Sequence, residues 1–254
     1  MTTLSGQPPE ERARDASHWA PPVEKLRVSG MPAEAINVNV EGRRVVGPLQ
    51  GFGRMWQKTY RVRLSGCAAT PVEVIKTWRE DFPEFWPPGA RFHAPITGIA
   101  PGEVAILNLA AGPMKLSTGV MVLYADEESF TFMNPQGHIF AGFITFSAFE
   151  EDECTVAQAQ ALVRANDPLY EIAFSLGVSG REDRFWEETL KSLAARFDVE
   201  GQVQTYVTCI DPKRQWSQAK NIWHNAAIRS ALYTLAAPVR WVTRPFRGSP
   251  PLSL

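Results

Sequence analysis

Cysteine is scarce in this chain, and its spacing forms no motif. Only Cys67, Cys154 and Cys209 occur in 254 residues, and no two of them make a Cys-x-x-Cys pair. A disulfide framework or a zinc site is therefore not expected. We interpret all three as reduced side chains that serve as small apolar residues, which predicts a cytoplasmic location.

Long apolar runs and a large net charge are also missing. No stretch approaches the roughly 18 apolar residues that a membrane-spanning helix needs. The first thirty residues contain Glu10, Glu11 and Asp15 and no apolar run, so we do not expect a cleaved signal peptide. The formal net charge of −1 argues against nucleic acid as a partner.

The chain lacks the short motifs of common enzyme classes. It contains no Gly-x-Ser-x-Gly, no dinucleotide-binding fingerprint and no phosphate-binding loop. It also has no His-x3-His pair, so a metal site would need residues from distant parts of the chain. We therefore predict no cofactor and no metal, and the sequence leaves open whether the protein is an enzyme.

Hydrophobic residues are plentiful, at 44% of the chain with 14 Phe and 8 Trp, which is enough for one sizeable core. Residues 55–64 alternate between polar and aromatic or β-branched side chains, a pattern typical of a strand. Thr70, Pro71 and Glu73 then form a capping box with proline at the first helical position. We predict a helix that starts there and ends before Pro83.

Six strand-like segments follow, separated by short turns. Connections of a few residues cannot join parallel neighbours, so we expect an antiparallel meander. A second capping box at residues 179–182 begins a long helix, whose apolar residues recur every three or four positions up to Phe197. The six segments cover residues 90–99, 103–111, 115–124, 130–133, 138–149 and 154–165.

This order of elements resembles the helix-grip fold of the START-like superfamily, also called SRPBCC, which includes Bet v 1-type allergens and polyketide cyclases. The resemblance covers residues 55–199 and rests on element order, on the turns at 134–137 and 150–153, and on the helix at 181–197. It implies an α+β fold in which a curved antiparallel sheet of about seven strands wraps around the long helix. It also implies an apolar cavity between the two.

The expected organisation has four parts. Residues 1–30 are expected to form a disordered extension and residues 31–54 an irregular lead-in. Residues 55–210 would make the helix-grip ligand-binding domain, and residues 211–254 an extra basic amphipathic helix and tail.

The strands on either side of residues 150–153 allow a test of the implied fold. If Phe149 lies opposite Cys154, one face collects phenylalanines and alanines and the other is mixed and polar. We predict that the Phe/Ala face points inward at the long helix, either to hold a ligand or simply to pack. The predicted ligand-binding residues are Phe130, Phe132, His138, Phe140, Ile144, Phe146, Ala159, Trp186 and Leu190.

His138 is the candidate for acid–base chemistry, because it falls on the inward face at the start of its strand. No acidic partner is identifiable nearby in the sequence, and a structural role is the alternative. His93 and Asn108 are weaker candidates. Asp167 and Tyr170 precede the long helix and could gate the cavity, although a turn with a packed tyrosine is the simpler interpretation.

Acidic residues are missing from the C-terminal end. Residues 212–254 carry seven Lys or Arg and no Asp or Glu. Asp211 and Pro212 predict the start of a helix that continues through Trp223 to Pro238. Its aromatic and basic residues fit a helix packed on the domain, which we favour, or a surface for an anionic membrane or a protein partner.

Three functions are compatible with these patterns. The first is binding of an apolar or amphipathic small molecule, of lipid, polyketide or aromatic type, in the implied cavity. The second is an enzyme of cyclase or hydrolase type that uses the same cavity with His138 as acid or base. The third is an interaction or membrane-surface module built on the basic tail. A second titratable group bonded to His138 would favour the enzyme over simple binding.

Overall fold

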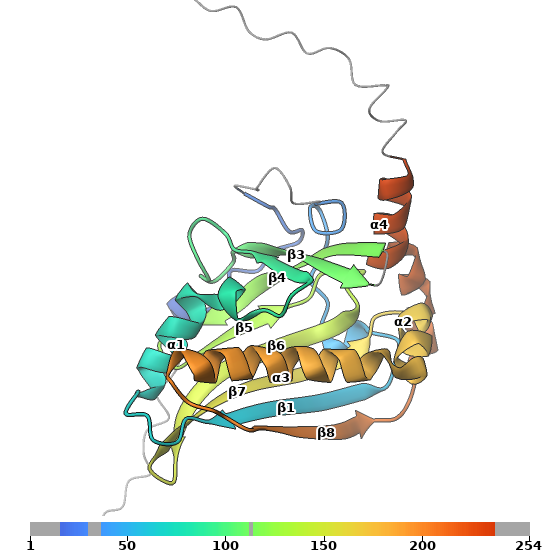
Figure 1. The fold of residues 1–254 in the computed structure, drawn as a ribbon. Coiled ribbons are helices and arrows are strands. Elements are labelled where there is room, and N and C mark those ends of the chain that lie inside the picture. The colour runs from blue at the N-terminus through green and yellow to red at the C-terminus, as the bar shows by residue number, and fades with distance from the viewer. Residues whose placement is uncertain (1–15, 30–36, 112–113, 237–254) are drawn as a thin grey trace, which may run out of the picture.

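A computed structural model describes residues 16–29, 37–111 and 114–236 of the chain. They build one antiparallel sheet of eight strands in the order β2-β3-β4-β5-β6-β7-β1-β8. The long helix α3 (Ser179–Arg196) lies across one face of this sheet (Figure 1). The predicted helix-grip fold is thereby confirmed, with one strand more than the seven expected. Within the described ranges, no helix combines the length and the apolar character needed to cross a membrane.

The strands follow the predicted segments closely. The main difference is β2, which stops at His93 instead of continuing to residue 99, because Pro95 cannot donate to a ladder and a turn begins there. The strand bounds are β1 Met55–Arg63, β2 Ala90–His93, β3 Val104–Ala111, β4 Met114–Ala125, β5 Ser129–Met133, β6 Phe140–Glu151, β7 Cys154–Ala165 and β8 Val203–Asp211.

The first helix, α1 (Pro71–Glu80), begins as the capping box predicts. The Thr70 side chain accepts from the backbone N–H of Glu73, and the Glu73 carboxylate accepts from the backbone N–H of Thr70 at 2.8 Å. The short helix η3 (Phe82–Phe85) then carries the chain toward the sheet.

The hairpin between β6 and β7 confirms the predicted faces and corrects their register. Phe149 pairs with Val156 rather than with Cys154, because the turn consists of only Asp152 and Glu153, with φ angles of 50° and 56°. The register therefore differs by two residues. Since side chains alternate with a period of two, every residue stays on its predicted face.

The inner face of the sheet carries the main core. Phe146 pairs with Ala159 across the hairpin, and both side chains are fully buried. Trp78 of α1 packs edge-on against Phe146 and Phe130, at ring-centroid distances of 5.1 Å and 6.1 Å. Leu190 of α3 is buried in the same cluster. Helix α1 packs on β6 and β7 at this end of the sheet.

The entry into α3 differs from the prediction. The chain arrives from α2 (Pro168–Ala173) through the π-helical segment η4 (Phe174–Val178), in which Gly177 has a φ of 100°. The Glu182 carboxylate, expected to complete a capping box, instead accepts a hydrogen bond from Lys58 Nζ at 2.7 Å. The Ser179 side chain lies outside the described residues.

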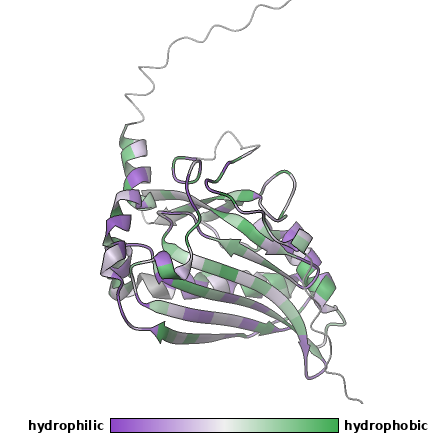
Figure 2. Ribbon diagram, turned by 180° about the vertical axis from the view of Figure 1, so that it is seen from behind, coloured by the Kyte–Doolittle hydropathy of each residue, from purple (hydrophilic) through white to green (hydrophobic). Residues whose placement is uncertain are grey.

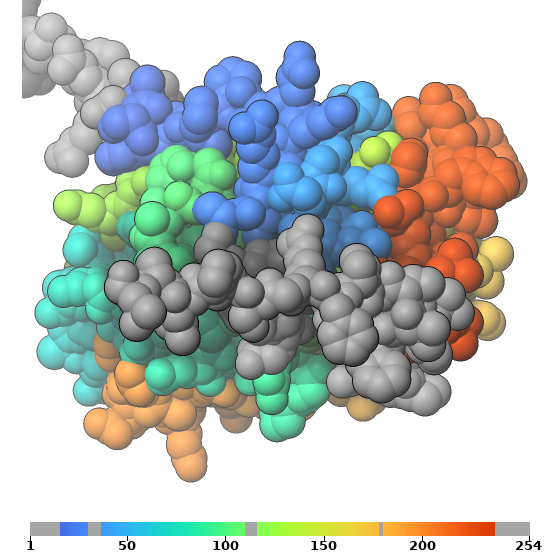
Figure 3. Space-filling view, turned by 90° about the horizontal axis from the view of Figure 1, so that it is seen from above, coloured from blue at the N-terminus to red at the C-terminus, as the bar shows by residue number. Residues whose placement is uncertain are grey.

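The outer face of the sheet is covered in part by residues from the N-terminal side. Trp19 packs on Tyr124 of β4 with ring centroids 4.7 Å apart, and Leu26 is almost fully buried. Leu26, Val40 and Met121 form a second, smaller core. Parts of the predicted extension and lead-in thus pack on the sheet, and Figure 3 shows them in blue beside the orange C-terminal helices. Residues 1–15 lie outside the described part.

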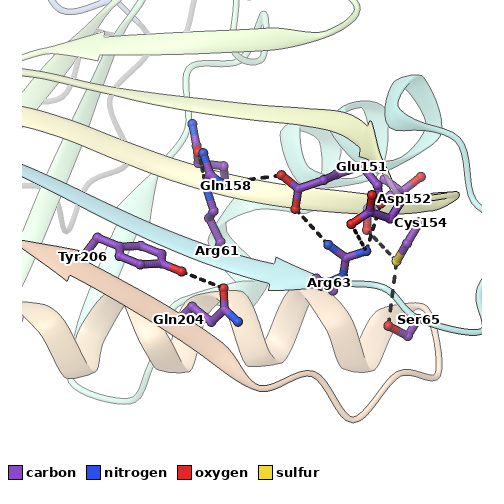
Figure 4. Close-up of polar contacts among 10 residues, drawn as sticks. Arg61, Arg63, Ser65, Glu151, Asp152, Cys154, Gln158, Gln204 and Tyr206 are labelled. Atoms are coloured by element: carbon purple, nitrogen blue, oxygen red, sulfur yellow. Dashed lines mark hydrogen bonds and ion pairs between the residues drawn. The ribbon is translucent and has the colours of Figure 1, made fainter.

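The outer face of β7 carries polar side chains, as predicted, and so does that of its neighbour β1. Arg61 Nε donates to Gln158 Oε1 at 2.7 Å, and Arg63 forms an ion pair with Glu151 at 2.8 Å (Figure 4). Such partly exposed pairs contribute little to the free energy of unfolding. They leave this side of the sheet solvated, so the ligand question concerns the inner face.

The C-terminal part differs most from the prediction. Asp211 ends β8 rather than starting a helix, because its carboxylate pairs with the buried Arg164 and accepts from the backbone N–H of Lys213. Two short helices replace the single predicted one, namely η5 (Trp216–His224) and α4 (Ala226–Leu235). Asn225 separates them and caps α4, which packs on β4. Residues 237–254, with Trp241 and Phe246, lie outside the described part.

Candidate functional site

A cavity of about 350 Å³ lies between the inner face of the sheet and α3. Its walls come from strands β2 to β7, from the loop that follows η3, and from η4 and α3. Almost all of the lining is aromatic or aliphatic. The apolar side chains are Trp86, Pro87, Pro88, Ala90, Phe92, Leu107, Leu109, Leu116, Val120, Phe132, Ile139, Phe140, Ile144, Ala161, Val163, Phe174, Phe185 and Trp186.

The nine predicted ligand-binding residues divide into two groups. Phe132, His138, Phe140, Ile144 and Trp186 line the cavity. Phe130, Phe146, Ala159 and Leu190 belong instead to the fully buried core. Trp78 of α1 causes the division, since its ring fills the space in front of Phe130 and Phe146.

His138 enters the cavity lining as a neutral ring. It is 7% exposed, and its Nδ1 accepts a hydrogen bond from the backbone N–H of Phe140 at 3.0 Å. A ring nitrogen that accepts carries no proton, so the proton is assigned to Nε2, which is then a donor. Burial lowers the pKa of His138 to about 4, so the ring is uncharged near pH 7.

No second titratable side chain is hydrogen-bonded to His138 within the described ranges. Its carbonyl oxygen accepts from Asn166 Nδ2 at 2.9 Å, and its ring Nδ1 is hydrogen-bonded to the Phe140 backbone. Asn134 also lines the cavity. Its backbone N–H donates to the Gly142 carbonyl, and its own carbonyl accepts from the backbone N–H of Val46. The two residues together offer uncharged hydrogen-bonding groups rather than an acid–base pair.

A charged network at the α3 side of the cavity was not predicted from the sequence. Lys58 of β1 is 5% exposed, and its Nζ donates to Glu182 at 2.7 Å and to Asp183 at 2.8 Å. Tyr60 donates its hydroxyl to the same Asp183 oxygen at 2.7 Å. Burial alone would lower the pKa of Lys58, but the two carboxylates outweigh it and raise the pKa, so the lysine is charged. Lys58 lies two residues from Trp56 and two from Tyr60 on the same strand, so all three side chains point to the same face. That spacing was the available sign that Lys58 points inward.

Glu182 and its neighbour Arg181 complete the polar lining of the cavity. Because Lys58 holds Glu182 in place, the first turns of α3 are fixed against β1 along this edge. The cavity therefore has polar residues on two of its sides, with Asn134 and His138 from the turn between β5 and β6, and Arg181 and Glu182 from α3. His138 thus lies just before β6 and not at the start of the strand, where it was predicted.

The weaker candidates lie away from the cavity. Asn108 Nδ2 and His93 Nε2 are 2.9 Å apart across β2 and β3, and neither residue lines the cavity. Asp167 is fully buried as the N-cap of α2, and the Tyr170 hydroxyl accepts from the backbone N–H of Ala227 at 3.1 Å. These contacts fit a turn with a packed tyrosine and not a gate.

The described part of the chain contains no cluster of side chains that could bind a metal ion. No three His, Cys, Asp or Glu residues there are grouped closely enough to hold an ion. The cysteines Cys67, Cys154 and Cys209 are all free.

The burial of His138 leads to a prediction about acid stability. Between pH 6.5 and pH 4 the unfolded chain takes up a proton at this ring that the folded chain does not, so the free energy of unfolding falls as the pH decreases. At about 1.4 kcal/mol per pH unit, the loss at this site reaches about 3 kcal/mol. Above pH 7 both states are neutral and the effect is absent.

Urea unfolding of the wild type and of His138→Gln at several pH values measures this effect. We expect the two free energies of unfolding to run parallel above pH 7. Below pH 6.5 the wild type should lose stability more steeply than the variant. Parallel curves down to pH 4 would show that the ring is protonated in the folded state.

The strand order, the position of α3 and the apolar cavity between α3 and the sheet define a helix-grip α+β protein. No family model matches the chain, and no curated protein matches it at a significant level.

Solved structures with a similar arrangement include a START superfamily protein from Mycobacterium smegmatis. It is 20% identical over 57% of this chain and 98% of its own, with a TM-score of 0.39. The major latex-like protein 151 from Panax ginseng is 13% identical over 57% of this chain and 99% of its own, with a TM-score of 0.36. The di-domain ARO/CYC StfQ from the steffimycin biosynthetic pathway is 10% identical over 57% of this chain and 51% of its own, with a TM-score of 0.45. These likenesses concern the arrangement of elements alone.

Proposed function

We propose that this protein binds an apolar or amphipathic small molecule in the cavity between the sheet and α3. The observation that carries the proposal is a partly open cavity of about 350 Å³ with a nearly continuous apolar lining and a few polar groups. Pockets of this composition obtain affinity from buried apolar area, at about 25 cal/mol per Å² before the costs of binding. Their polar groups then fix the orientation of the ligand.

The size of the cavity limits the class of ligand. A volume of about 350 Å³ lies at the small end of the range of about 300–1,000 Å³ that small-molecule pockets cover. It suits a single ring system or one short acyl chain better than a lipid with two chains. Phe92, Phe132 and Trp186 offer ring faces and edges for aromatic contact.

The polar lining adds a requirement for hydrogen bonding. His138 presents a neutral ring with Nε2–H as a donor, and the Asn134 amide can both donate and accept. A hydroxyl or carbonyl oxygen on the ligand would suit both groups. The proposed ligand is therefore a mainly apolar molecule with one or two oxygen functions.

The alternative of a cyclase or hydrolase type of enzyme has less support. It needs a partner that sets the protonation state of His138, and no such side chain is bonded to the ring among the described residues. Simple binding needs only the uncharged ring that the cavity already contains.

Two measurements test the proposal. Native mass spectrometry of the protein purified from its own host should show a co-purifying small molecule, and denaturation should release it. Titration with a fluorescent apolar probe such as 1-anilinonaphthalene-8-sulfonate should show saturation at one site per chain. A probe signal that never saturates, together with a mass equal to that of the chain alone, would contradict ligand binding.

A further inference from the structure

Helix α4 exposes large apolar side chains along one face. Ile228, Leu232 and Leu235 are 40%, 60% and 75% exposed, and their spacing of four and three places them on one side of the helix. The opposite side contains Ala226 and Ser230, which are buried against β4. A surface helix of a soluble domain normally buries its large apolar residues and exposes polar ones. In α4 this order is reversed.

The buried side of α4 is held by polar contacts rather than by apolar packing. Ser230 Oγ accepts from Asn39 Nδ2 at 3.0 Å and from the backbone N–H of Ser117 at 3.1 Å. Figure 1 shows that α4 extends beyond the edge of the sheet, and Figure 2 shows hydrophobic residues along that part. The apolar stripe of Ile228, Leu232 and Leu235 is thus a fixed feature of the surface.

Exposed aromatic residues also occur on η5, the helix just before α4. Trp223 is 80% exposed and Trp216 is 74% exposed. Single exposed apolar residues are ordinary on protein surfaces. Trp223, however, lies two residues before Asn225, the N-cap of α4, so a large exposed ring and the apolar stripe occur together on this stretch of the chain, which indicates a binding surface.

Arginines gather next to the same helices without acidic partners. Arg43 Nη1 lies 3.0 Å from His224 Nδ1, and Arg229 donates to the Asn39 side chain and to the Val38 carbonyl. Burial lowers the pKa of His224, and the charges of Arg43, Arg229 and Arg44 lower it further. Within the part of the chain that the structure describes, none of these three arginines forms an ion pair with a carboxylate. The cluster Arg43, Arg44 and Arg229 is therefore a concentration of positive charge beside the apolar stripe.

This surface adjoins the cavity. The backbone N–H of Ala226 at the start of α4 donates to the Gly137 carbonyl at 2.9 Å, and the next residue, His138, lines the cavity. On the neighbouring η4, Phe174 lines the cavity, whereas Leu176 is 81% exposed.

We propose that the face formed by η5 and α4 docks on an anionic lipid bilayer. In this arrangement Trp223 and the stripe of Ile228, Leu232 and Leu235 enter the boundary between headgroups and acyl chains. Arg43, Arg44 and Arg229 bind the lipid phosphates. The proposal does not depend on the identity or the presence of a ligand in the cavity.

Charge and composition favour a bilayer over the other possible occupants. Residues 212–254 contain no Asp or Glu, and exposed tryptophan and leucine beside Lys and Arg are typical of helices that lie in the membrane interface. A symmetric dimer through this face would place the two arginine clusters against each other, which is unfavourable.

Flotation of the full chain with vesicles tests the proposal. We expect the protein to float with vesicles of phosphatidylcholine and phosphatidylglycerol, not with phosphatidylcholine alone, and to be released by salt. Arg44→Glu should lower the partition coefficient by about tenfold or more, since each basic residue near an anionic surface contributes about a fivefold factor and the change also adds a negative charge. Leu232→Glu should lower it by about tenfold or more, because it replaces an apolar side chain that would enter the bilayer with a carboxylate that the anionic surface repels. Both side chains are exposed, so thermal unfolding should stay as in the wild type.

Two matched variants serve as controls. Ile96 is 87% exposed in the loop after β2, and Arg91 is exposed on β2 itself. Ile96→Glu and Arg91→Glu make the same chemical changes away from α4 and should leave flotation unchanged.

Three results would overturn the proposal. They are equal flotation with neutral and anionic vesicles, no flotation with either, and equal losses in the control variants. Light scattering without vesicles adds a further check, because a dimer that Leu232→Glu dissociates in a protein that does not float would identify a protein interface instead. None of these substitutions should change the affinity of the cavity for the apolar probe, whether or not the protein binds vesicles.

Discussion

An Ala161→Phe variant is expected to bind an apolar probe at least about tenfold more weakly than the wild type. Ala161 lies on the inner face of β7, pairs with Ile144 and is part of the cavity lining. A phenyl ring at this position would occupy space that the ligand needs, and tenfold corresponds to about 1.4 kcal/mol of lost binding free energy. Because the ring enters a cavity rather than a filled core, the free energy of unfolding should fall by no more than the roughly 1–3 kcal/mol that overpacking typically costs.

The neighbouring position supplies the control for this variant. Gln160 precedes Ala161 on the same strand and points to the outer face, where it donates to Thr59 Oγ1. Gln160→Phe should leave probe affinity unchanged. Ile144→Trp is a second variant that fills the cavity from β6, and isothermal titration can compare all three with the wild type. Unchanged affinity in both cavity variants would place the probe elsewhere on the protein.

Lys58→Met is expected to lower the free energy of unfolding by about 3 kcal/mol, the loss typical when one partner of a buried ion pair is removed. Lys58 is 5% exposed, and its Nζ is bonded to both Glu182 and Asp183. Without the ammonium, two carboxylates would face each other at the edge of the cavity with only the Tyr60 hydroxyl as a donor. Urea unfolding at pH 7 measures the change.

Two further variants make this prediction specific. Arg63 lies on the same strand as Lys58 and forms a partly exposed ion pair with Glu151 of β6. Arg63→Met should lower the free energy of unfolding by less than about 1 kcal/mol. Adding Glu182→Leu to Lys58→Met removes one stranded carboxylate and should restore more than half of the lost stability. If Lys58→Met costs no more than Arg63→Met, the network does not hold α3 in place.

Local patterns in the sequence were sufficient to predict most elements. The capping box at Thr70 and Glu73 forms as expected, because both of its bonds join residues three positions apart. The faces of β6 and β7 also follow from the sequence, because a period of two assigns side chains even when the register differs by two. The extra helix after β8 was predicted from Asp211 and Pro212, yet Asp211 is bound by Arg164, a partner far away in the sequence.

The candidate site was only partly predictable for the same reason. The inward direction of Phe132, Phe140 and Ile144 follows from strand alternation, and these residues line the cavity. The packing of Trp78 in front of Phe130 and Phe146 depends on where α1 lies, and no pattern within β5 or β6 contains that information.

The sequence by itself determined the order of elements, the inward faces of the strands and the lack of acidic residues at the basic end, since each depends on neighbours within a few positions. Only the tertiary structure decided where the inner face is filled and where it stays open. It also decided that Lys58 meets Glu182, which is 124 residues away, and that α4 turns its leucines outward. Those outcomes depend on distances between elements that are remote in the chain, and these distances are set only when the elements pack together.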